Sequence, residues 1–363
     1  MLTTNTIRDL LNDAPTPVLS LYLHVDPGHQ PNQNDPRAWT IYVKNALRDV
    51  ENSLDEDSEI AITDIRKSVE NFVEGYTPTG KSLALFVGED DYIEAFDIPV
   101  AIENQHAFGD INLVPMLWAL DEYERYLVVL VDSEEARFMS AYLGRATTDD
   151  TLSIDFDDYD FGQHTFVDAR SGREGMFRQS SGGEQFEDMK AEHMRRFHNT
   201  VAEQIRDIMT GMQSERIILG GNEKAAHQVK NLLHGTMQNK VVDIMPIPMS
   251  ANDSEVSSAI QETALAYERE QEMTLVDEVI GFAKAGGRGA IDMDVIEDAL
   301  ERQQVDLLIL PYPMDDEAVA ADLTLQALQS GATVELVHGN AAARLTHEAP
   351  AAVRLYYALP EQA

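Results

Sequence analysis

The residues best suited to chemistry lie between Phe161 and Gln204, where arginines, glycines and serines precede a charged helical pattern. Guanidinium groups, glycine N–H groups and a helix N-terminus are donors that suit phosphate oxygens. The stretch therefore predicts an RNA-contacting segment, with a surface hairpin carrying incidental arginines as the alternative. From His164 to His198 it balances six acidic residues with six basic ones: Arg170, Arg173, Arg178, Lys190, Arg195 and Arg196.

The charge of the whole chain works against a nucleic-acid partner. Its 363 residues include 64 acidic and 27 basic ones, which gives a net charge of -37. Phosphate backbones favour basic surfaces, because binding releases their condensed counterions. RNA binding would therefore depend on local patches, and no DNA partner is expected. We interpret most of the acidic residues as an adaptation for solubility.

Composition also excludes several kinds of site. The chain has no cysteine, so disulfides, thiolate metal sites and cysteine nucleophiles are ruled out. The ten histidines are scattered, and neither a metal nor a cofactor is expected. No run approaches the roughly 20 apolar residues that a membrane span needs, and the opening residues lack a secretory signal pattern. The sequence predicts a cytoplasmic protein without a membrane partner.

Alternating strand and helix patterns predict an α/β protein of three domains, with mixed or parallel sheets flanked by helices. The first domain is expected at residues 1–123. Its apolar runs predict strands at Pro17–Asp26 and Ser82–Gly88, and its helical periods predict helices at Ala38–Leu54 and Ile60–Val73.

The second domain is expected at residues 124–211 and the third at residues 212–363. In the second, two strands precede a long polar loop at residues 144–185, and a helix follows from Glu184 to Met209. Its apolar stripe, expected to be buried, consists of Phe186, Met189, Phe197, Val201, Ile205 and Ile208. The third alternates strands with helices, which predicts a largely parallel sheet.

The first domain offers a second candidate contact in its loop Pro27–Arg37, whose prolines and asparagines argue against regular structure. Amide and guanidinium groups can hydrogen-bond exposed bases and sugar hydroxyls without a basic surface. A solvated loop is an equally good interpretation. The candidate residues are His29, Gln30, Asn32, Asn34 and Arg37.

Several motifs resemble a known family when they are taken in order. The run Ser180–Gln185 followed by RRFHNTVAEQI resembles the middle domain of archaeal and eukaryotic class-one release factors and Pelota proteins. The runs RIILGG, VIEDALERQQVDLLIL, GATVELV and AAVRLYY are similar to the family's C-terminal domain. Among bacterial members, the order is most similar to that of a hibernation factor.

This resemblance implies a ribosome-binding factor that occupies the A site together with elongation factor Tu and its guanine nucleotide. It places the middle domain against 23S rRNA near the peptidyl-transferase centre. The loop Pro27–Arg37 is our candidate for a contact with 16S rRNA at the decoding centre on its position and chemistry alone. The residues implied on the peptidyl-transferase side are Arg170, Arg173, Arg178, Gly182, Gly183, Gln185, Arg195 and Arg196.

The same loop argues against peptide release. In the releasing family, a Gly-Gly-Gln loop brings its glutamine to the peptidyl-tRNA ester, whereas here Glu184 stands between Gly183 and Gln185. A carboxylate beside a developing oxyanion is electrostatically adverse. We therefore expect a non-catalytic protein without catalytic residues. A peptidyl-tRNA-hydrolysing rescue factor and a small-molecule-binding α/β protein remain alternatives.

Overall fold

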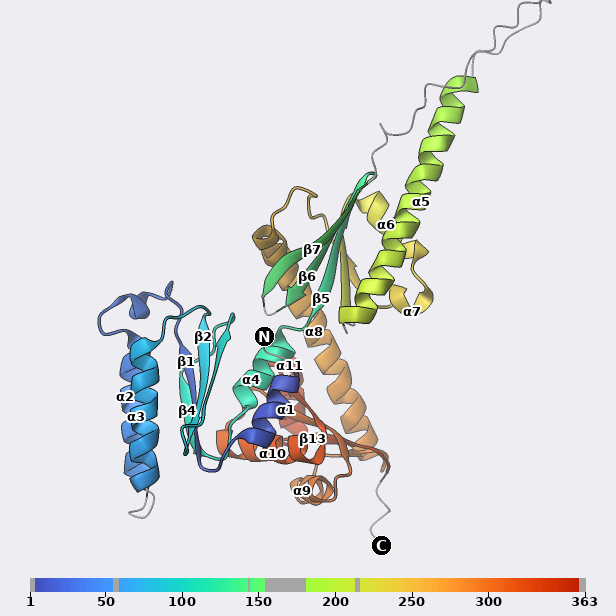
Figure 1. The fold of residues 1–363 in the computed structure, drawn as a ribbon. Coiled ribbons are helices and arrows are strands. Elements are labelled where there is room, and N and C mark those ends of the chain that lie inside the picture. Colours follow the sequence, from blue (N-terminus) through green and yellow to red (C-terminus); the bar gives the residue numbers. More distant parts are fainter. Residues whose placement is uncertain (1–3, 55–58, 143, 154–180, 213–215, 359–363) are drawn as a thin grey trace, which may run out of the picture. The chain divides into compact units, whose positions relative to one another are not determined.

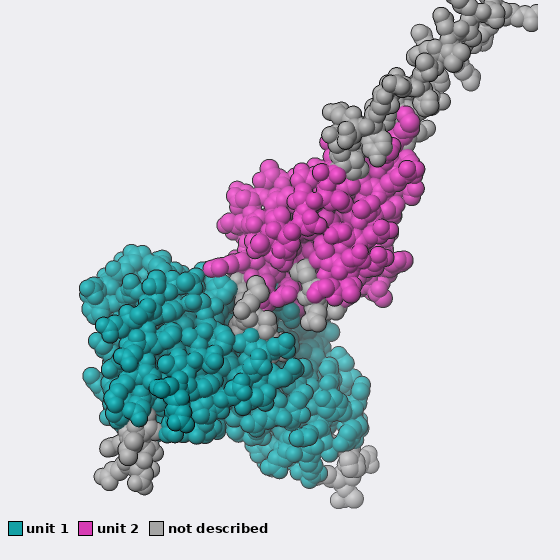
Figure 2. Space-filling model, in the orientation of Figure 1, with its two compact units in different colours: residues 1–124, 265–363 teal, residues 125–264 magenta. Residues whose placement is uncertain are grey.

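The computed structural model describes residues 4–54, 59–142, 144–153, 181–212 and 216–358. The chain folds into two compact units, shown in different colours in Figure 2. Unit 1 consists of Met1–Glu124 and Leu265–Ala363, and unit 2 of Arg125–Ala264. The backbone therefore passes from unit 1 into unit 2 and back. No helix among the described residues is long and apolar enough to cross a membrane.

The first sheet of unit 1 is antiparallel, with strand order β3-β2-β1-β4. Its central strand β1 is apolar almost throughout, as a strand buried on both faces must be. One face packs against helices α2 and α3, which present apolar residues at helical spacing (Figure 1). The elements are β1 (Val18–His24), α2 (Ala38–Ser53), α3 (Glu59–Gly75), β2 (Ser82–Gly88), β3 (Ile93–Ile98) and β4 (Gln105–Gly109).

The second sheet of unit 1 is mixed, with strand order β10-β13-β11-β12. Only β11 and β12 are parallel. Helices α9 and α10 cover one face, and α11 with the C-terminal half of α8 covers the other. These elements are α8 (Asp253–Lys284), β10 (Gly289–Ala290), α9 (Met293–Glu301), β11 (Val305–Pro311), α10 (Glu317–Ser330), β12 (Thr333–Val337), α11 (Gly339–Glu348) and β13 (Ala352–Leu355). Helices α1 (Thr4–Asp13) and α4 (Val114–Glu122) complete the unit.

Unit 2 is built on a five-stranded sheet of order β7-β6-β5-β8-β9. Alternate residues of β5 point to opposite faces, where α5 and α6 cover one side and the start of α8 covers the other (Figure 1). The elements are β5 (Tyr126–Val131), β6 (Glu135–Tyr142), β7 (Arg145–Ser153), α5 (Ser181–Met212), β8 (Arg216–Gly221), α6 (Glu223–Leu232), α7 (Gly235–Gln238) and β9 (Val241–Ile244).

The three sheets and their helices confirm the predicted α/β class, but the divisions differ from those expected. Strand β8 pairs in parallel with β5, so unit 2 continues to Ala264 rather than ending at residue 211. The sheet that follows it is mixed rather than largely parallel. Residues 145–153 form strand β7 against β6, inside the expected loop. Strand β4 and helix α11 were not predicted from the sequence.

Gly221 ends β8 in a tight turn that only glycine fits. Its φ is 89°, and an added Cβ would collide with the carbonyl oxygen of Val131. Its N–H donates to the carbonyl oxygen of Ile247 at 2.9 Å, which ties β8 to the segment after β9. The turn therefore fixes where the parallel strands of unit 2 end.

We predict that Gly221→Ala lowers the free energy of unfolding of unit 2 by about 3 kcal/mol, because it adds backbone strain and a steric clash. The measurement is urea unfolding followed by circular dichroism. Gly211→Ala on α5 is the matched control, since its added Cβ meets nothing within 4 Å. It should stabilise the helix by about 0.5–1 kcal/mol. Equal unfolding midpoints for both variants would contradict this assignment.

Candidate functional site

Helix α5 is anchored to unit 2 through its C-terminal half. Phe197, Val201, Ile205 and Met209 recur every four residues and lie buried in one core cluster. No residue from 189 to 196 is buried, and Met189 is 46% exposed, so the predicted burial of the apolar stripe is wrong at that residue. The half from Ser181 to Arg196 is about 24 Å long at 1.5 Å per residue. Figure 1 shows this half extending beyond the sheet.

The Gly-Gly-Glu-Gln run lies within the first turns of this helix. Gly182, Gly183 and Gln185 are helical, so the structure differs from the loop expected up to residue 185. The first four N–H groups of an α-helix have no acceptor within the helix, and its N-terminal end carries a partial positive charge. The backbone at Gly182 and Gly183 therefore offers hydrogen-bond donors to a negatively charged partner.

Two of the predicted arginines follow on the same projecting half. Arg195 donates to both carboxylate oxygens of Glu192, at 2.8 and 2.9 Å, and Arg196 donates to one of them at 2.9 Å. These bonds, first those from Arg195, lower the pKa of Glu192 to about 2. The carboxylate of Glu192 thus pairs with two exposed guanidinium groups, so these three side chains together carry a net charge of one positive unit. Arg170, Arg173 and Arg178 lie outside the described residues.

His198 begins the packed half of α5 and is buried, with 2% of its surface exposed. Its Nε2 lies 3.1 Å from the carbonyl oxygen of Asp132, in the turn between β5 and β6. That bond joins the helix to the sheet at the point where its projecting half begins. The run RRFHNTVAEQI, on which the family resemblance partly rests, therefore includes a packing residue.

The second predicted contact, Pro27–Arg37, lies in unit 1 and contains a short 3-10 helix at Gln30–Gln33, which the sequence analysis did not expect. Four of its candidates are exposed: His29, Gln30, Asn34 and Arg37. Asn32 is buried, and its amide donates to the carbonyl oxygens of His24 at 2.8 Å and Asp26 at 3.1 Å. Asn32 therefore braces the loop instead of facing an external base.

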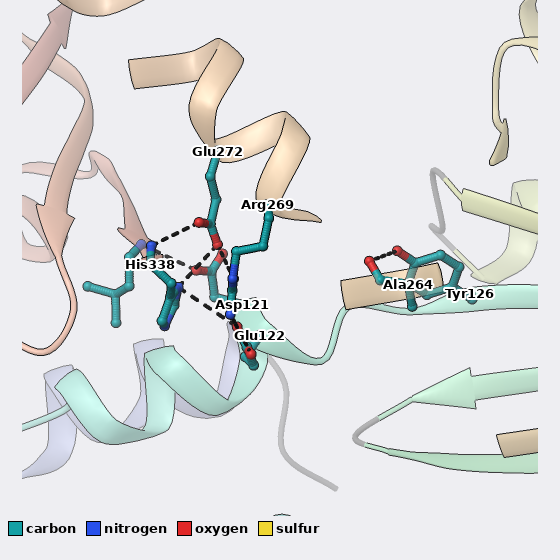
Figure 3. Close-up of polar contacts among 8 residues, drawn as sticks. Asp121, Glu122, Tyr126, Ala264, Arg269, Glu272 and His338 are labelled. Carbon is teal, nitrogen blue, oxygen red and sulfur yellow. Dashed lines mark hydrogen bonds and ion pairs between the residues drawn. The ribbon is translucent and has the colours of Figure 1, made fainter. Parts of the chain in front are cut away.

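A buried ionic cluster in unit 1 joins three elements that the sequence analysis did not connect (Figure 3). Arg269 of α8 donates to both carboxylate oxygens of Glu122, at 2.7 and 2.8 Å, and also to the carboxylate of Glu272. Glu272 in turn accepts the backbone N–H of His338 at 2.8 Å, and its other oxygen lies 3.1 Å from Nδ1 of that histidine. The cluster thus ties α8 to the end of α4 and to the start of α11.

A metal ion could fit this spacing, because potential ligand atoms of three side chains lie within 4.8 Å of one another. These side chains are Glu122, Glu272 and His338. Arg269 already donates to both carboxylates, so the protein supplies the positive charge between them itself. Isolated buried charges are strongly unfavourable, and pairing offsets much of that penalty. We therefore assign the ionic cluster a structural role.

Asp121 stands next to this cluster, and its surroundings disfavour the charged form of its carboxyl group. Burial raises its pKa well above the usual carboxyl value, and nearby Glu335, Glu124 and Glu272 raise it further. A single 3.3 Å hydrogen bond from the backbone N–H of Leu336 opposes that shift. Asp121 therefore resists ionisation in the folded protein.

Comparison with known families gives these features a context. Residues 112–265 match the model of the family described as "Bacterial archaeo-eukaryotic release factor family 10". The match begins just before α4 and ends just after unit 2, so it contains the whole of unit 2 and the projecting helix. Over this region the chain is similar to the bacterial release-factor-like proteins, which confirms the resemblance seen for the middle of the sequence. No curated protein matches the chain.

Solved structures of a translation termination factor and of Pelota proteins are similar to this chain at low identity. An archaeal translation termination factor, aRF1, is 17% identical, with 97% of this chain and 96% of that chain covered and a TM-score of 0.28. Dom34 of S. cerevisiae is 11% identical, with coverages of 76% and 75% and a TM-score of 0.45. Archaeal Pelota, in a model of its ribosome-bound complex with ABCE1, is 11% identical, with coverages of 99% and 95% and a TM-score of 0.46. TM-scores below 0.5 give these whole-chain similarities no further weight.

We predict that Asp121→Asn raises the free energy of unfolding at pH 7 by about 1 kcal/mol. Because the folded-state pKa is raised, the stabilising contribution of Asp121 is present below the ordinary carboxyl pKa near 4 and is lost as the pH rises through the folded-state value. The advantage of the Asp121→Asn variant should therefore shrink toward pH 4.

The measurement is urea unfolding between pH 4 and pH 8. Asp9→Asn, at an exposed aspartate of α1, is the matched control for the general loss of one negative charge. If Asp121→Asn proved less stable than Asp9→Asn at pH 7, Asp121 would be ionised and stabilising in the folded protein, contrary to its assigned role.

Proposed function

We propose that the protein binds the ribosomal A site, from the decoding centre toward the peptidyl-transferase centre, and keeps the ribosome inactive without releasing peptide. The observation that carries this proposal is the family match over residues 112–265, which includes the projecting half of α5. The order of sequence motifs also resembles that of the ribosome hibernation factor Balon. In this proposal the protein acts by occupying the site and not by catalysis.

The projecting half of α5 is the part that would approach 23S rRNA near the peptidyl-transferase centre. It reaches beyond its own sheet, has backbone N–H groups near Gly182 and Gly183 that the helix itself does not use, and carries the exposed Arg195 and Arg196. Phosphate oxygens can replace Glu192 at these guanidinium groups, because exposed ion pairs contribute little and exchange readily. Local donors could therefore bind RNA although the whole chain is acidic.

The geometry at Gln185 favours occupation over hydrolysis. Release would require a glutamine held beside the ester with no adverse charge nearby. Here Glu184 directly precedes Gln185, and both lie in a helix, whose backbone N–H and C=O groups beyond the first turn bond to one another. The peptide-releasing rescue factor that would act through Gly182-Gly183-Glu184-Gln185 remains the second candidate, because this run sits at the projecting end of α5.

Two further contacts complete the proposal. The exposed residues His29, Gln30, Asn34 and Arg37 would meet 16S rRNA at the decoding centre, with Asn32 holding their loop in shape. The C-terminal part of unit 1 would face elongation factor Tu with its guanine nucleotide, as the family resemblance implies. The similar solved structures are themselves named with partners, Hbs1 for Dom34 and ABCE1 for Pelota.

We predict that the purified protein cosediments with ribosomes carrying peptidyl-tRNA and releases no peptide from them. Binding is measured by sedimentation, and hydrolysis is measured by the release of labelled peptide. A conventional release factor acting on a stop codon is the positive control for release. Peptide release by this protein that disappears in Gln185→Ala would establish the rescue factor instead. Absence from the ribosomal fraction would overturn both candidates.

We also predict that Arg196→Glu weakens ribosome binding by about tenfold or more, since it replaces a phosphate-binding charge with a repulsive one. Arg206→Glu is the matched control, because Arg206 is exposed on the packed half of the same helix. Binding is measured by sedimentation over a range of salt concentrations. Equal losses for the two variants would show that the position on α5 does not matter, and would remove the projecting half from the interface.

A further inference from the structure

A cavity of about 400 Å³ lies within unit 1, beside the rings of Trp118 and Tyr312. Its volume falls within the range of small-molecule sites. The floor is buried and apolar, and it is formed by Ile102, Val114, Leu310, Ala320 and Leu336. The floor thus excludes water from one side of any molecule that enters.

The aromatic wall of the cavity is preformed. The Trp118 and Tyr312 rings lie nearly parallel, with centroids 5.8 Å apart and an interplanar angle of 20°. Both rings are partly exposed, so part of their surface is accessible from the cavity. Such π-surfaces attract cations.

Two carboxylates line the same cavity, and no cationic side chain lines it with them. Glu103 precedes β4, Glu317 begins α10, and both are exposed. Burial raises the pKa of Tyr312, and the charges of Glu317 and Glu103 raise it further, so both carboxylates lie within electrostatic reach of its phenol. Among the described residues that line the cavity there is no lysine, arginine or histidine. The cavity therefore repels phosphates and carboxylates and attracts positive charge.

We propose that this cavity binds an organic cation, a guanidinium or alkylammonium group whose charge faces Glu103 and Glu317 and whose apolar part lies against Trp118 and Tyr312. A bare metal ion would leave the aromatic wall and apolar floor unused. The chemistry could come from a basic side chain of a partner protein or from a free polyamine. The site is independent of the proposed ribosome binding, so either can fail alone.

The test uses the intrinsic fluorescence of the full chain. Only two tryptophans are present, and Trp39 is 1% exposed, so a change on titration reports Trp118. The probes are N-acetylarginine amide for a protein side chain and spermidine for a free polyamine. N-acetylcitrulline amide has nearly the same shape as the first probe without its charge, and it controls for apolar binding.

At least one cation should give a saturable change below about 10 mM, with N-acetylcitrulline amide binding at least tenfold more weakly than N-acetylarginine amide. Glu317→Gln with Glu103→Gln should weaken the binding of that cation at least tenfold. Glu297→Gln, at an exposed carboxylate of α9 outside the cavity, should leave it unchanged. Tighter binding of N-acetylarginine amide identifies a partner's side chain as the source, and tighter binding of spermidine identifies a polyamine. The proposal is overturned if neither cation saturates, if N-acetylcitrulline amide binds as tightly as the cation that saturates, or if the double variant binds that cation like wild type.

Discussion

Four buried side chains on one face of α5 hold the element on which the proposed function depends. Phe197, Val201, Ile205 and Met209 pack into the core of unit 2, and His198 adds a polar contact to the turn after β5. An α-helix satisfies its backbone hydrogen bonds internally, so its other half can extend past the domain without a supporting layer. The anchored half thereby fixes the direction of the projecting half, which carries Gly182 and Arg196.

The distribution of charge follows the same division. The overall net charge of -37 repels the phosphate backbone of RNA and so disfavours non-specific RNA binding. Cations in the described part of the chain serve particular tasks: Arg269 neutralises buried carboxylates, whereas Arg195 and Arg196 share a single exposed one. Binding specificity would then rest on a few placed donors and not on a basic surface. The carboxylates that line the cavity extend the same logic to a positively charged ligand.

Local patterns in the sequence were enough to predict the strands and helices whose apolar residues keep a regular period, such as β2 and α2. They failed where the determinant is not local. Strand β7 is polar because it lies at the edge of its sheet, and the parallel pairing of β8 with β5 leaves no mark near either strand. Glu122 and His338 lie 147 and 66 residues from their partners on α8, so no spacing could reveal the ionic cluster. The burial of Asn32 could not be predicted either, because the sequence does not distinguish an asparagine that stabilises its own loop from one that binds an RNA base.

A cryo-EM map of the protein bound to ribosomes from growth-arrested cells tests the central claim most directly. We expect density in the A site, with the N-terminal end of α5 directed toward the peptidyl-transferase centre and the 27–37 loop at the decoding centre. Intact peptidyl-tRNA beside that helix would agree with occupation without release. Density elsewhere on the ribosome, or an α5 end facing solvent, would contradict the account.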